Sequence, residues 1–553
     1  MSLLRNFQSS FFGGIMQSSS RLLVIANISL SPDASYAEAF SVADKRLKSI
    51  GISTSNISYS LFKKSIDARK KEDIKLIYSV ACRGEIRHLR DRELQKITAS
   101  YHTLQVPSVK PGNARLSARP IVVGAGPAGL FAALLLAENG YMPIVIERGG
   151  NIDDRVKSQD RLYRNRVLDT SSNIQFGLGG AGTFSDGKLI TRTNDALCNF
   201  VLSTFVKFGA PLEITYQAKP HIGTDILRTM VTAMAERIVA LGGEIRYFTT
   251  LKDLRVSCGN VTEVITDKGS IPAGAVILAI GHSARDTHET LFKQGFSVEA
   301  KNFSVGMRIE HLAEDIDRSM LGKFAGKPSL GHAEYALSCN TKVRGAYTFC
   351  MCPGGEVVCA SSEEGGLVVN GMSYSDRGGR NSNSALVVSV FKEDFGADPL
   401  SAIEFQRNIE RRAFAAGGGD YSAPIITVGD FLSGRLGSEP SRILPTYMAG
   451  GVRLAKPSDY LPDFVSEGIR RAILNFEYKI KGFSCPDAIL TGAETRTSSP
   501  VRILRDASTH RAFGVENLFP SGEGAGYAGG ITSAAIDGIR CAMSLIETYK
   551  PLA

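Results

Sequence analysis

The chain has 553 residues, which is too many for one ordinary core, so several domains are expected. Its residues are 43% hydrophobic and 22% charged, and no run approaches the roughly 18 consecutive apolar residues that a membrane span requires. The net charge is +9, most of it in the first 100 residues. These properties argue against a membrane span and favour a cytoplasmic protein.

The nine cysteines form no CxxC pair and no cluster with histidine at zinc spacing. A chain of this length needs no disulfide framework, so we expect a reducing compartment and no structural metal. Residues 1–20 are predicted to be a disordered leader. They contain no acid and are rich in serine, which leaves open a transit peptide and a location in an organelle stroma.

Residues 21–105 are predicted to form a small α+β domain of the ferredoxin-like kind. Strand patterns at 21–27, 57–64 and 74–81 alternate with helix patterns at 35–50 and 85–98. The segment is basic, so it could meet nucleic acid or an acidic partner, or it could simply be a solvated surface. Because no RNA-binding motif is recognisable, nucleic acid is not the favoured partner. A proline-containing linker, 106–119, follows.

The segment 120–149 has the pattern of a nucleotide-binding βαβ unit. Strands at 121–123 and 143–146 flank a G-x-G-x-x-G turn at 124–129 and a helix over 130–139, and an acid, Glu147, closes the second strand. The glycines permit a tight turn and a close approach to a pyrophosphate at the helix N-terminus, and Glu147 would accept hydrogen bonds from the adenosine ribose. The expected contacts are Gly124, Gly126, Pro127, Ala128, Gly129, Glu147 and Arg148.

Two further segments decide between FAD and NAD. The apolar strand 276–280, which ends in Gly281, resembles the "ATG" strand that passes the cofactor in FAD enzymes. Near the C-terminus a short strand ends in Gly522 and Glu523 before a helix over 532–546. This resembles the terminal "GD" motif, with Glu523 in place of aspartate, and implies that the acid binds the ribityl chain while the helix N-terminus faces the flavin. The expected contacts are Gly281, Gly522, Glu523, Gly529, Gly530 and Ile531.

A third glycine-rich segment spans 172–188. It formally contains G-x-G-x-x-G, but no strand precedes it, so a loop is predicted rather than a second nucleotide fold. Its backbone amides could wrap the flavin or the pyrophosphate. The expected contacts are Gly179, Gly180, Ala181, Gly182 and Thr183.

With segments 279–287, 349–355 and 494–503, these motifs resemble the uncharacterised FAD-dependent dehydrogenase (NAD/FAD-utilising dehydrogenase) family, from about Ile57 to Arg540. The resemblance implies an FAD-dependent oxidoreductase of unknown substrate. Leu178 departs from it, because the family is expected to have glutamate there. No separate NAD(P)-binding unit appears, so the implied architecture is closer to the hydroxybenzoate-hydroxylase and geranylgeranyl-reductase group.

The predicted fold class is α/β. A discontinuous Rossmann-type FAD-binding domain is expected at 120–300 and 491–553, with an inserted α+β substrate domain at 301–490 and the small N-terminal domain before it. Within the substrate domain, the polar, glycine-rich stretch 373–384 is expected to be a loop.

Four residues are candidates for chemistry. Cys350, with Cys352, could exchange electrons with flavin, although such a pair on an extended chain closes a strained disulfide and ordinary packing is the alternative. Arg496 and Arg502 could bind an anionic substrate or stabilise reduced flavin, or could form structural ion pairs. Glu310, on one face of a predicted strand, could act as a general acid.

We therefore expect an FAD-dependent oxidoreductase that transfers a hydride between flavin and a small-molecule substrate, with external NAD(P)H or a protein as electron donor. Two alternatives remain. The basic N-terminal segment would suit a flavin-dependent RNA-modifying enzyme. A binding protein whose FAD is structural or sensory is the other. No G-x-S-x-G motif supports hydrolysis.

Overall fold

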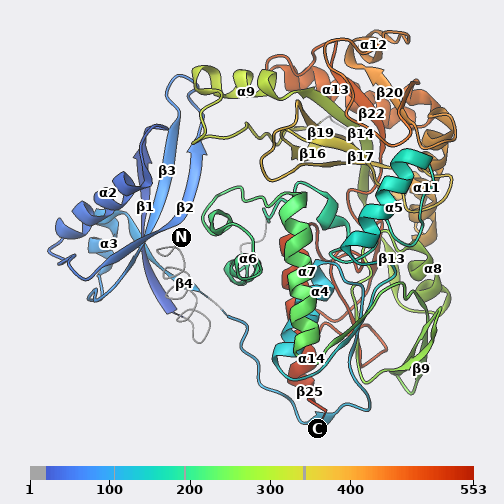
Figure 1. The fold of residues 1–553 in the computed structure, drawn as a ribbon, viewed down its shortest axis with the longest axis horizontal. Helices are drawn as coiled ribbons and strands as arrows, with labels where there is room; N and C mark the ends of the chain where they lie inside the picture. Colours follow the sequence, from blue (N-terminus) through green and yellow to red (C-terminus); the bar gives the residue numbers. More distant parts are fainter. Residues whose placement is uncertain (1–19, 105, 192–194, 341–343, 553) are drawn as a thin grey trace. The chain divides into compact units, whose positions relative to one another are not determined.

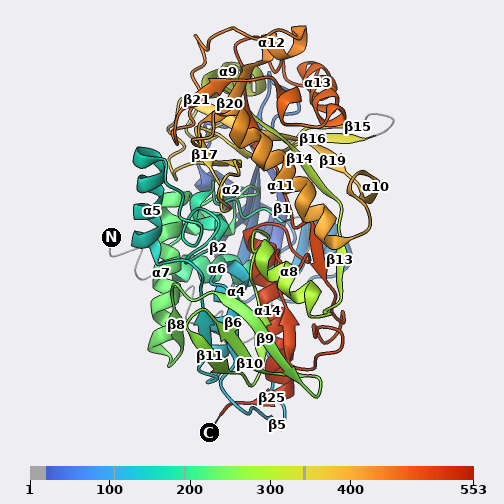
Figure 2. The same ribbon diagram turned by 90° about the vertical axis from the view of Figure 1, so that its right-hand side faces the viewer.

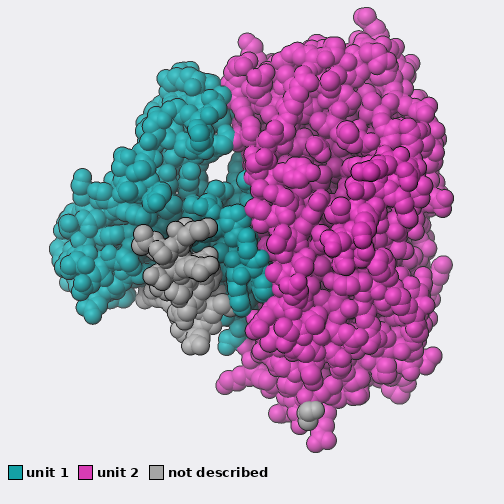
Figure 3. All heavy atoms as spheres, viewed as in Figure 1, with its two compact units in different colours: residues 1–108, 189–221, 320–331 teal, residues 109–188, 222–319, 332–553 magenta. Residues whose placement is uncertain are grey.

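The computed structural model describes residues 20–104, 106–191, 195–340 and 344–552. The chain divides into two compact units (Figure 3). Unit 1 comprises residues 1–108, 189–221 and 320–331, and unit 2 comprises 109–188, 222–319 and 332–553. The predicted leader, residues 1–20, lies outside the described residues except for Ser20. All residues that we expect to bind the cofactor belong to unit 2.

Unit 1 contains a four-stranded antiparallel sheet in the order β2-β3-β1-β4. Its elements follow the chain as β1 (Ser20–Leu30), α2 (Tyr36–Lys48), β2 (Ser58–Asp67), β3 (Lys75–Arg83), α3 (Asp91–Ile97) and β4 (Ala99–Leu104). Helix α2 buries Ala39, Ala43 and Leu47, on the stripe that the sequence predicts, and both helices cover one face of the sheet (Figure 1). This order of strands, with a helix after β1 and another after β3, is the predicted ferredoxin-like arrangement.

Helix α3 is shorter than the predicted 85–98, because its N-terminus is fixed at Arg90. The Glu93 carboxylate accepts a hydrogen bond of 3.0 Å from the Arg90 backbone N–H and binds the Arg87 guanidinium. A glutamate at this position caps the helix and prevents extension toward residue 85. Unit 1 also holds α6 (Cys198–Lys207) and the short 3-10 helices η2 (Leu212–Thr215) and η3 (Gly322–Phe324).

Unit 2 is built first on a five-stranded parallel sheet in the order β24-β12-β6-β7-β8. The strands are β6 (Ile121–Val123), β7 (Ile144–Ile146), β8 (Glu244–Arg246), β12 (Val276–Leu278) and β24 (Leu518–Pro520). Helix α4 (Pro127–Glu138) packs on this sheet, with α7 (Thr224–Ala240) and α14 (Ile531–Thr548) against it. The sheet therefore joins residues from both ends of the predicted discontinuous domain.

An antiparallel three-stranded sheet packs on the other face through an apolar core. It consists of β9 (Leu251–Ser257), β10 (Asn260–Thr266) and β11 (Gly269–Pro272). The remaining elements of this part are β5 (Ala114–Arg115), α5 (Ile152–Asn165), η1 (Ala181–Phe184), α8 (Arg285–Lys293), β13 (Val298–Ala300), β23 (Val501–Ile503) and β25 (Tyr549–Lys550). In the described ranges, no helix is both long and apolar enough to cross a membrane.

A mixed seven-stranded sheet, in the order β15-β16-β19-β14-β22-β20-β21, forms the rest of unit 2. Its strands are β14 (Phe303–Leu312), β15 (Ser338–Asn340), β16 (Gly345–Cys352), β19 (Asn381–Val390), β20 (Ala423–Thr427), β21 (Val452–Leu454) and β22 (Ile489–Glu494). Helices α11 (Pro399–Ala416) and α13 (Asp463–Glu477) pack against it (Figure 2). The smaller elements are α9 (Ala313–Leu321), β17 (Glu356–Cys359), β18 (Val369–Met372), α10 (Lys392–Phe395), α12 (Val428–Ser433) and η4 (Pro457–Asp459).

The predicted loop 373–384 is wrong at its C-terminal end, because residues 381–384 begin the buried strand β19. The sequence looks like a loop because these residues are polar, but their side chains find buried partners. Asn381 donates to the Glu310 carboxylate at 3.0 Å, and Asn383 accepts from the Arg308 guanidinium at 2.7 Å. Buried polar groups that are paired in this way are compatible with a central strand.

Candidate functional site

Three glycine-bearing segments begin at one edge of the five-stranded parallel sheet. Strand β12 lies between β6 and β24, with Leu278 opposite both Val123 and Pro520. Three segments therefore leave the sheet next to one another. They are the turn at 124–129 (the glycine turn), the segment 279–283, and residues 521–530 (the C-terminal turn). The carboxyl edge of a parallel sheet is where open α/β folds bind ligands.

Two glycines of the glycine turn are required by the fold itself. Gly124 has a φ of +100°, and a side chain there would meet the Ala279 carbonyl oxygen at 2.3 Å. A Cβ on Gly129 would lie 1.9 Å from the Gly124 carbonyl oxygen. Both positions match the roles that the sequence predicts for them, the tight turn and the close packing of helix on strand.

Gly126 is different, because the protein does not fill the space beside it. It is the N-cap of α4, with an ordinary φ of −75°. The nearest atom to an added Cβ is the Cα of Gly180, at 3.9 Å. Here the glycine leaves room for a ligand at the helix N-terminus, where unpaired backbone N–H groups attract an anion.

Glu147 ends β7 as predicted and is 5% exposed. Its carboxylate accepts hydrogen bonds from the backbone N–H groups of Ala125 (2.7 Å), Gly149 (2.9 Å) and Gly177 (2.9 Å). Oε1 accepts two of these bonds and Oε2 accepts one, so Oε2 keeps a lone pair for a ribose hydroxyl. That ribose contact stays a prediction, as does cofactor contact by Arg148, which pairs with Asp286 and lies over the ring of Phe176.

Segment 172–188 (the glycine loop) has no strand before it, as predicted, and contains η1. The Gly179 N–H donates to the Ala125 carbonyl at 2.8 Å, so the loop is attached to the glycine turn. A Cβ on Gly182 would meet the Ile531 side chain at 3.0 Å, at the start of α14. The loop thus connects the first and last cofactor motifs, while Leu178, the departure from the family pattern, is a buried core residue.

Arg155 on α5 holds the glycine loop and was not predicted. It is fully buried, and its guanidinium donates to the carbonyls of Asn173, Ile174 and Leu178 at 2.5–3.1 Å. Burial lowers the pKa of Arg155 to about 9, so it remains a cation at neutral pH. A signal existed, because Arg155, Gln159 and Leu162 form the buried stripe of α5 at helical spacing.

The C-terminal turn is held from behind by Asp537 on α14. Its carboxylate accepts the Gly522 N–H at 2.7 Å and pairs with Arg505 at 2.6 Å. The Gly524 carbonyl accepts a hydrogen bond of 2.9 Å from Nε2 of the buried His288. Gly530, with a φ of +95°, caps the N-terminus of α14. These contacts fix the turn and leave the helix N-terminus at the carboxyl edge.

Asp537→Asn should weaken both the fold and cofactor retention. The amide keeps one acceptor oxygen but removes the charge that pairs with the buried Arg505, a loss of about 1.5–3 kcal/mol for a hydrogen bond to a charged group. We expect a lower melting temperature and faster FAD dissociation, measured by thermal unfolding and by flavin fluorescence on dilution. Glu516→Gln, which removes the exposed partner of Arg511, is the control and should change neither; equal effects would contradict the assignment.

Two titratable side chains with incomplete pairing face the C-terminal turn. Burial raises the pKa of Glu523 to about 7, although a hydrogen bond from the Gly530 backbone N–H acts to lower it. Burial also lowers the pKa of His282 to about 3, and its buried Nε2 has no hydrogen-bond partner in the described structure. His282 Nδ1 lies 3.8 Å from a Glu523 oxygen. A carboxyl group and an imidazole with free hydrogen-bonding capacity suit the polyhydroxyl and ring portions of FAD, so the residues present fit this cofactor.

Neighbouring open positions agree with that fit. A Cβ on Gly281, Gly529 or Gly530 would meet no atom within 4 Å. Gly281 lies three residues after the end of β12, whereas Gly529 and Gly530 lead into α14. Three motifs distant in sequence therefore present backbone without side chains around one edge, which is the requirement for a close approach of a large cofactor.

The four candidates for chemistry lie in different surroundings. The Arg496 guanidinium binds Glu410 (3.0 Å) and Ser283 (3.0 Å), next to Gly281 and His282. Arg502 on β23 makes longer contacts, 3.4 Å, to Glu299 and the Gly526 carbonyl, so it lies at the C-terminal turn. Both arginines are thus brought toward the cofactor motifs.

Glu310 is fully buried on β14 and accepts hydrogen bonds from Asn381 and Thr446. Burial raises the pKa of Glu310. These partners belong to the seven-stranded sheet and to the loop before β21, and not to the glycine segments. Its role as a general acid stays a prediction.

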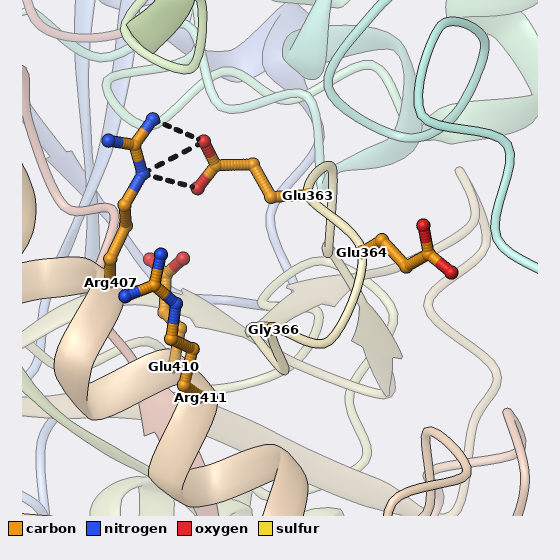
Figure 4. A pocket seen from close by; sticks show the side chains of 6 residues that line it. All are labelled: Glu363, Glu364, Gly366, Arg407, Glu410 and Arg411. Carbon is orange, nitrogen blue, oxygen red and sulfur yellow. Dashed lines mark hydrogen bonds and ion pairs between the residues drawn. The ribbon is translucent and has the colours of Figure 1, made fainter.

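A polar pocket of about 190 Å³ lies beside helix α11 (Figure 4). It is lined by Glu363, Glu364, Gly366, Arg407, Glu410 and Arg411. Arg407 binds the Glu363 carboxylate with its forked guanidinium, and Glu363 in turn binds Arg285. Glu363, Arg407, Glu410 and Arg411 are therefore already paired within the protein. None of the lining residues was singled out by the sequence.

Comparison with known proteins gives two matches to families. Residues 302–497 match the family described as "FAD-dependent protein, C-terminal domain-like", and residues 23–83 match a domain of unknown function (DUF8436). An uncharacterised protein of Clostridium beijerinckii is 46% identical over 532 residues, covering 95% of this chain and 98% of that protein.

Similar solved structures include L-amino acid deaminase from Proteus vulgaris, with 12% identity, coverage of 81% of this chain and 98% of that chain, and a TM-score of 0.33. Glycine oxidase from Bacillus cereus ATCC 14579 has 12% identity, covers 78% and 95%, and has a TM-score of 0.31. Likenesses this distant do not bear on the reaction. The family match and the 46% identical relative show that the chain belongs to the family of FAD-dependent proteins, and FAD is its cofactor.

Proposed function

We propose that the protein is an FAD-dependent oxidoreductase that transfers a hydride between its flavin and a small-molecule substrate. The observation that carries this proposal is the convergence of the glycine turn, segment 279–283 and the C-terminal turn on one edge of the parallel sheet. When bound, FAD supplies a ring that accepts or donates a hydride, and the protein supplies orientation and electrostatics.

The proposed contacts divide the cofactor among the motifs. The N-terminal amides of α4, freed by Gly126, bind the diphosphate, and Glu147 binds the adenosine ribose. Glu523 binds the ribityl chain. The N-terminus of α14 would lie toward the flavin ring, where its partial positive charge would favour negative charge. The glycine loop, held by Arg155, covers the diphosphate with backbone amides.

Three side chains near the C-terminal turn are proposed to serve the reaction. Because burial raises the pKa of Glu523 to about 7, its carboxyl group can hold or release a proton at neutral pH. Arg502, which is only loosely engaged, is proposed to bind an anionic group of the substrate. Arg496 is proposed as a positioning residue, since it fixes Ser283 beside His282. The substrate would be held by the segment 301–490, and electrons would come from external NAD(P)H or a protein.

An anaerobic titration of the FAD-loaded protein with NADPH and with NADH tests this function. We expect NADPH or NADH to bleach the oxidised-flavin absorbance. If neither does, we expect small organic acceptors to reoxidise the photoreduced flavin. Photoreduction is the control that the flavin can take up electrons. A flavin that photoreduces but exchanges electrons with neither nucleotide nor any acceptor would contradict the proposal and favour structural or sensory FAD.

A further inference from the structure

Cys350 and Cys352 lie at an irregular end of β16. The register between β16 and β19 shifts between Phe349 and Cys352, and Cys350 has a φ of +45°, in the left-handed region that residues other than glycine rarely adopt. The sequence predicts an extended chain at this pair. In the structure the chain is bent at Cys350. The bend turns the Cys352 side chain back toward Cys350, where Cys352 Sγ donates to the Cys350 carbonyl oxygen at 3.4 Å.

Positive charge surrounds the pair. The fully buried Arg308 donates to the Cys350 carbonyl at 3.1 Å and lies 3.9 Å from Cys352 Sγ. Lys188 donates to the carbonyl of Met351, between the two cysteines. Arg308 is also paired with Glu494 at 2.7 Å, so the buried cation is compensated. A cationic, partly accessible environment is what distinguishes a reactive thiol from a structural one.

The protonation states of the two sulfurs differ. The hydrogen bond from Cys352, together with Arg308 and Lys188, lowers the pKa of Cys350 to about 7, whereas the pKa of Cys352 is raised. Cys350 is partly exposed and Cys352 is buried, which agrees with placing the thiolate on Cys350. By contrast, burial raises the pKa of Cys82 and of Cys541 to about 12.

The pair is located at the cofactor motifs rather than elsewhere in unit 2. Lys188 is the last residue of the glycine loop, so its contact with Met351 attaches the cysteine segment to that loop. The glycine loop in turn meets the start of α14 beside the C-terminal turn, because a Cβ on Gly182 would lie 3.0 Å from the Ile531 side chain. The thiolate, the glycine loop and the C-terminal turn therefore share one neighbourhood.

We propose that Cys350 and Cys352 are a redox pair that exchanges two electrons with the bound FAD. In one direction the Cys350–Cys352 sulfur–sulfur bond forms, the S–H bond of Cys352 breaks, and its proton and the two electrons pass to oxidised FAD. In the other direction reduced FAD returns the proton and the electrons, and the sulfur–sulfur bond breaks. The proposal rests on the proposed function, because it requires FAD at the carboxyl edge.

A reductive titration of the air-oxidised holoprotein under anaerobic conditions tests the pair. We expect the protein to consume two electron pairs per bound FAD, one for the flavin and one for the disulfide, and Cys350→Ser or Cys352→Ser to consume one. Cys339→Ser, which removes a partly exposed thiol of neighbouring β15, is the matched control and should still consume two. A wild-type protein that consumes one pair would overturn the proposal.

Peptide mapping gives a readout that does not depend on activity or on the variants folding. Under non-reducing conditions the oxidised wild-type protein should yield the segment around 350–352 with its two thiols blocked against alkylation, and the reduced protein should yield both thiols alkylated. Alkylation of Cys350 in the reduced protein should be half-maximal near pH 7. Free thiols at 350 and 352 in the oxidised protein would overturn the redox pair, even if NADPH or NADH reduces the flavin. A mapped disulfide in a protein whose flavin neither nucleotide reduces would support the pair and contradict the nicotinamide donor of the proposed function.

Discussion

Gly126→Ala is expected to lower the affinity for FAD by about 10- to 100-fold while leaving the apoprotein folded. A Cβ at this position meets no protein atom closer than 3.9 Å, and the φ of −75° suits alanine. The methyl group instead occupies the space at the N-terminus of α4 where the diphosphate would bind. Loss of one charge-assisted hydrogen bond, worth about 1.5–3 kcal/mol, corresponds to this change in affinity.

Equilibrium titration of the apoprotein with FAD, followed by quenching of flavin fluorescence, measures the effect, and thermal unfolding without FAD measures the fold. Gly140→Ala, at the other end of α4, is the matched control. Gly140 has a φ of +83° and open space around it, so alanine should strain the backbone by about 1 kcal/mol and leave FAD affinity unchanged. If Gly126→Ala binds FAD like the wild type, the diphosphate does not lie at this helix.

Glu410→Gln should destabilise unit 2 by about 3–5 kcal/mol, the cost of leaving buried charges without their partner. The Glu410 carboxylate is 1% exposed and binds two arginines, Arg285 at 2.7 Å and Arg496 at 3.0 Å. Glutamine keeps the volume but not the charge. Glu404→Gln, on the same helix α11, removes an exposed partner of Arg411 and should cost no more than about 1 kcal/mol.

The difference between the wild type and Glu410→Gln should depend on pH. Burial alone would raise the pKa of Glu410, but Arg285 and Arg496 hold it below the usual value near 4.5. A depressed folded pKa contributes stability that is present above about pH 4.5 and lost as the pH falls further. The difference between the two melting temperatures should therefore stay constant from pH 7 to about pH 5 and begin to narrow only below about pH 4.5. Similar melting temperatures for the two proteins at pH 7 would contradict the role of Glu410.

Local patterns predicted the parts of the fold that depend on neighbouring residues. The strand–turn–helix at 121–138, the loop at 172–188 and the helix after Gly530 follow from glycine placement and apolar periodicity, and the structure has all of them. The ferredoxin-like order of unit 1 was predicted for the same reason, since its connections are short. Predicted helix ends were less accurate; α4 begins at Pro127, three residues before the expected start.

The contacts that hold the site could not be predicted, because they join residues far apart in the chain. Arg285, Glu410 and Arg496 come from α8, α11 and the segment after β22. From its own segment, each of these residues is predicted to be a solvent-exposed charge. Only the tertiary fold buries them together. Asp537 on the apolar α14 was a visible exception, since an acid on a buried helix face needs a partner.

The absorption spectrum of the purified full-length protein, recorded after incubation with FAD and removal of the excess, tests the central claim most directly. We predict oxidised-flavin bands and, after denaturation, about one released FAD per chain, because the three glycine segments form one cofactor site at the carboxyl edge of one sheet. A folded protein that retains no flavin after this treatment would contradict the account.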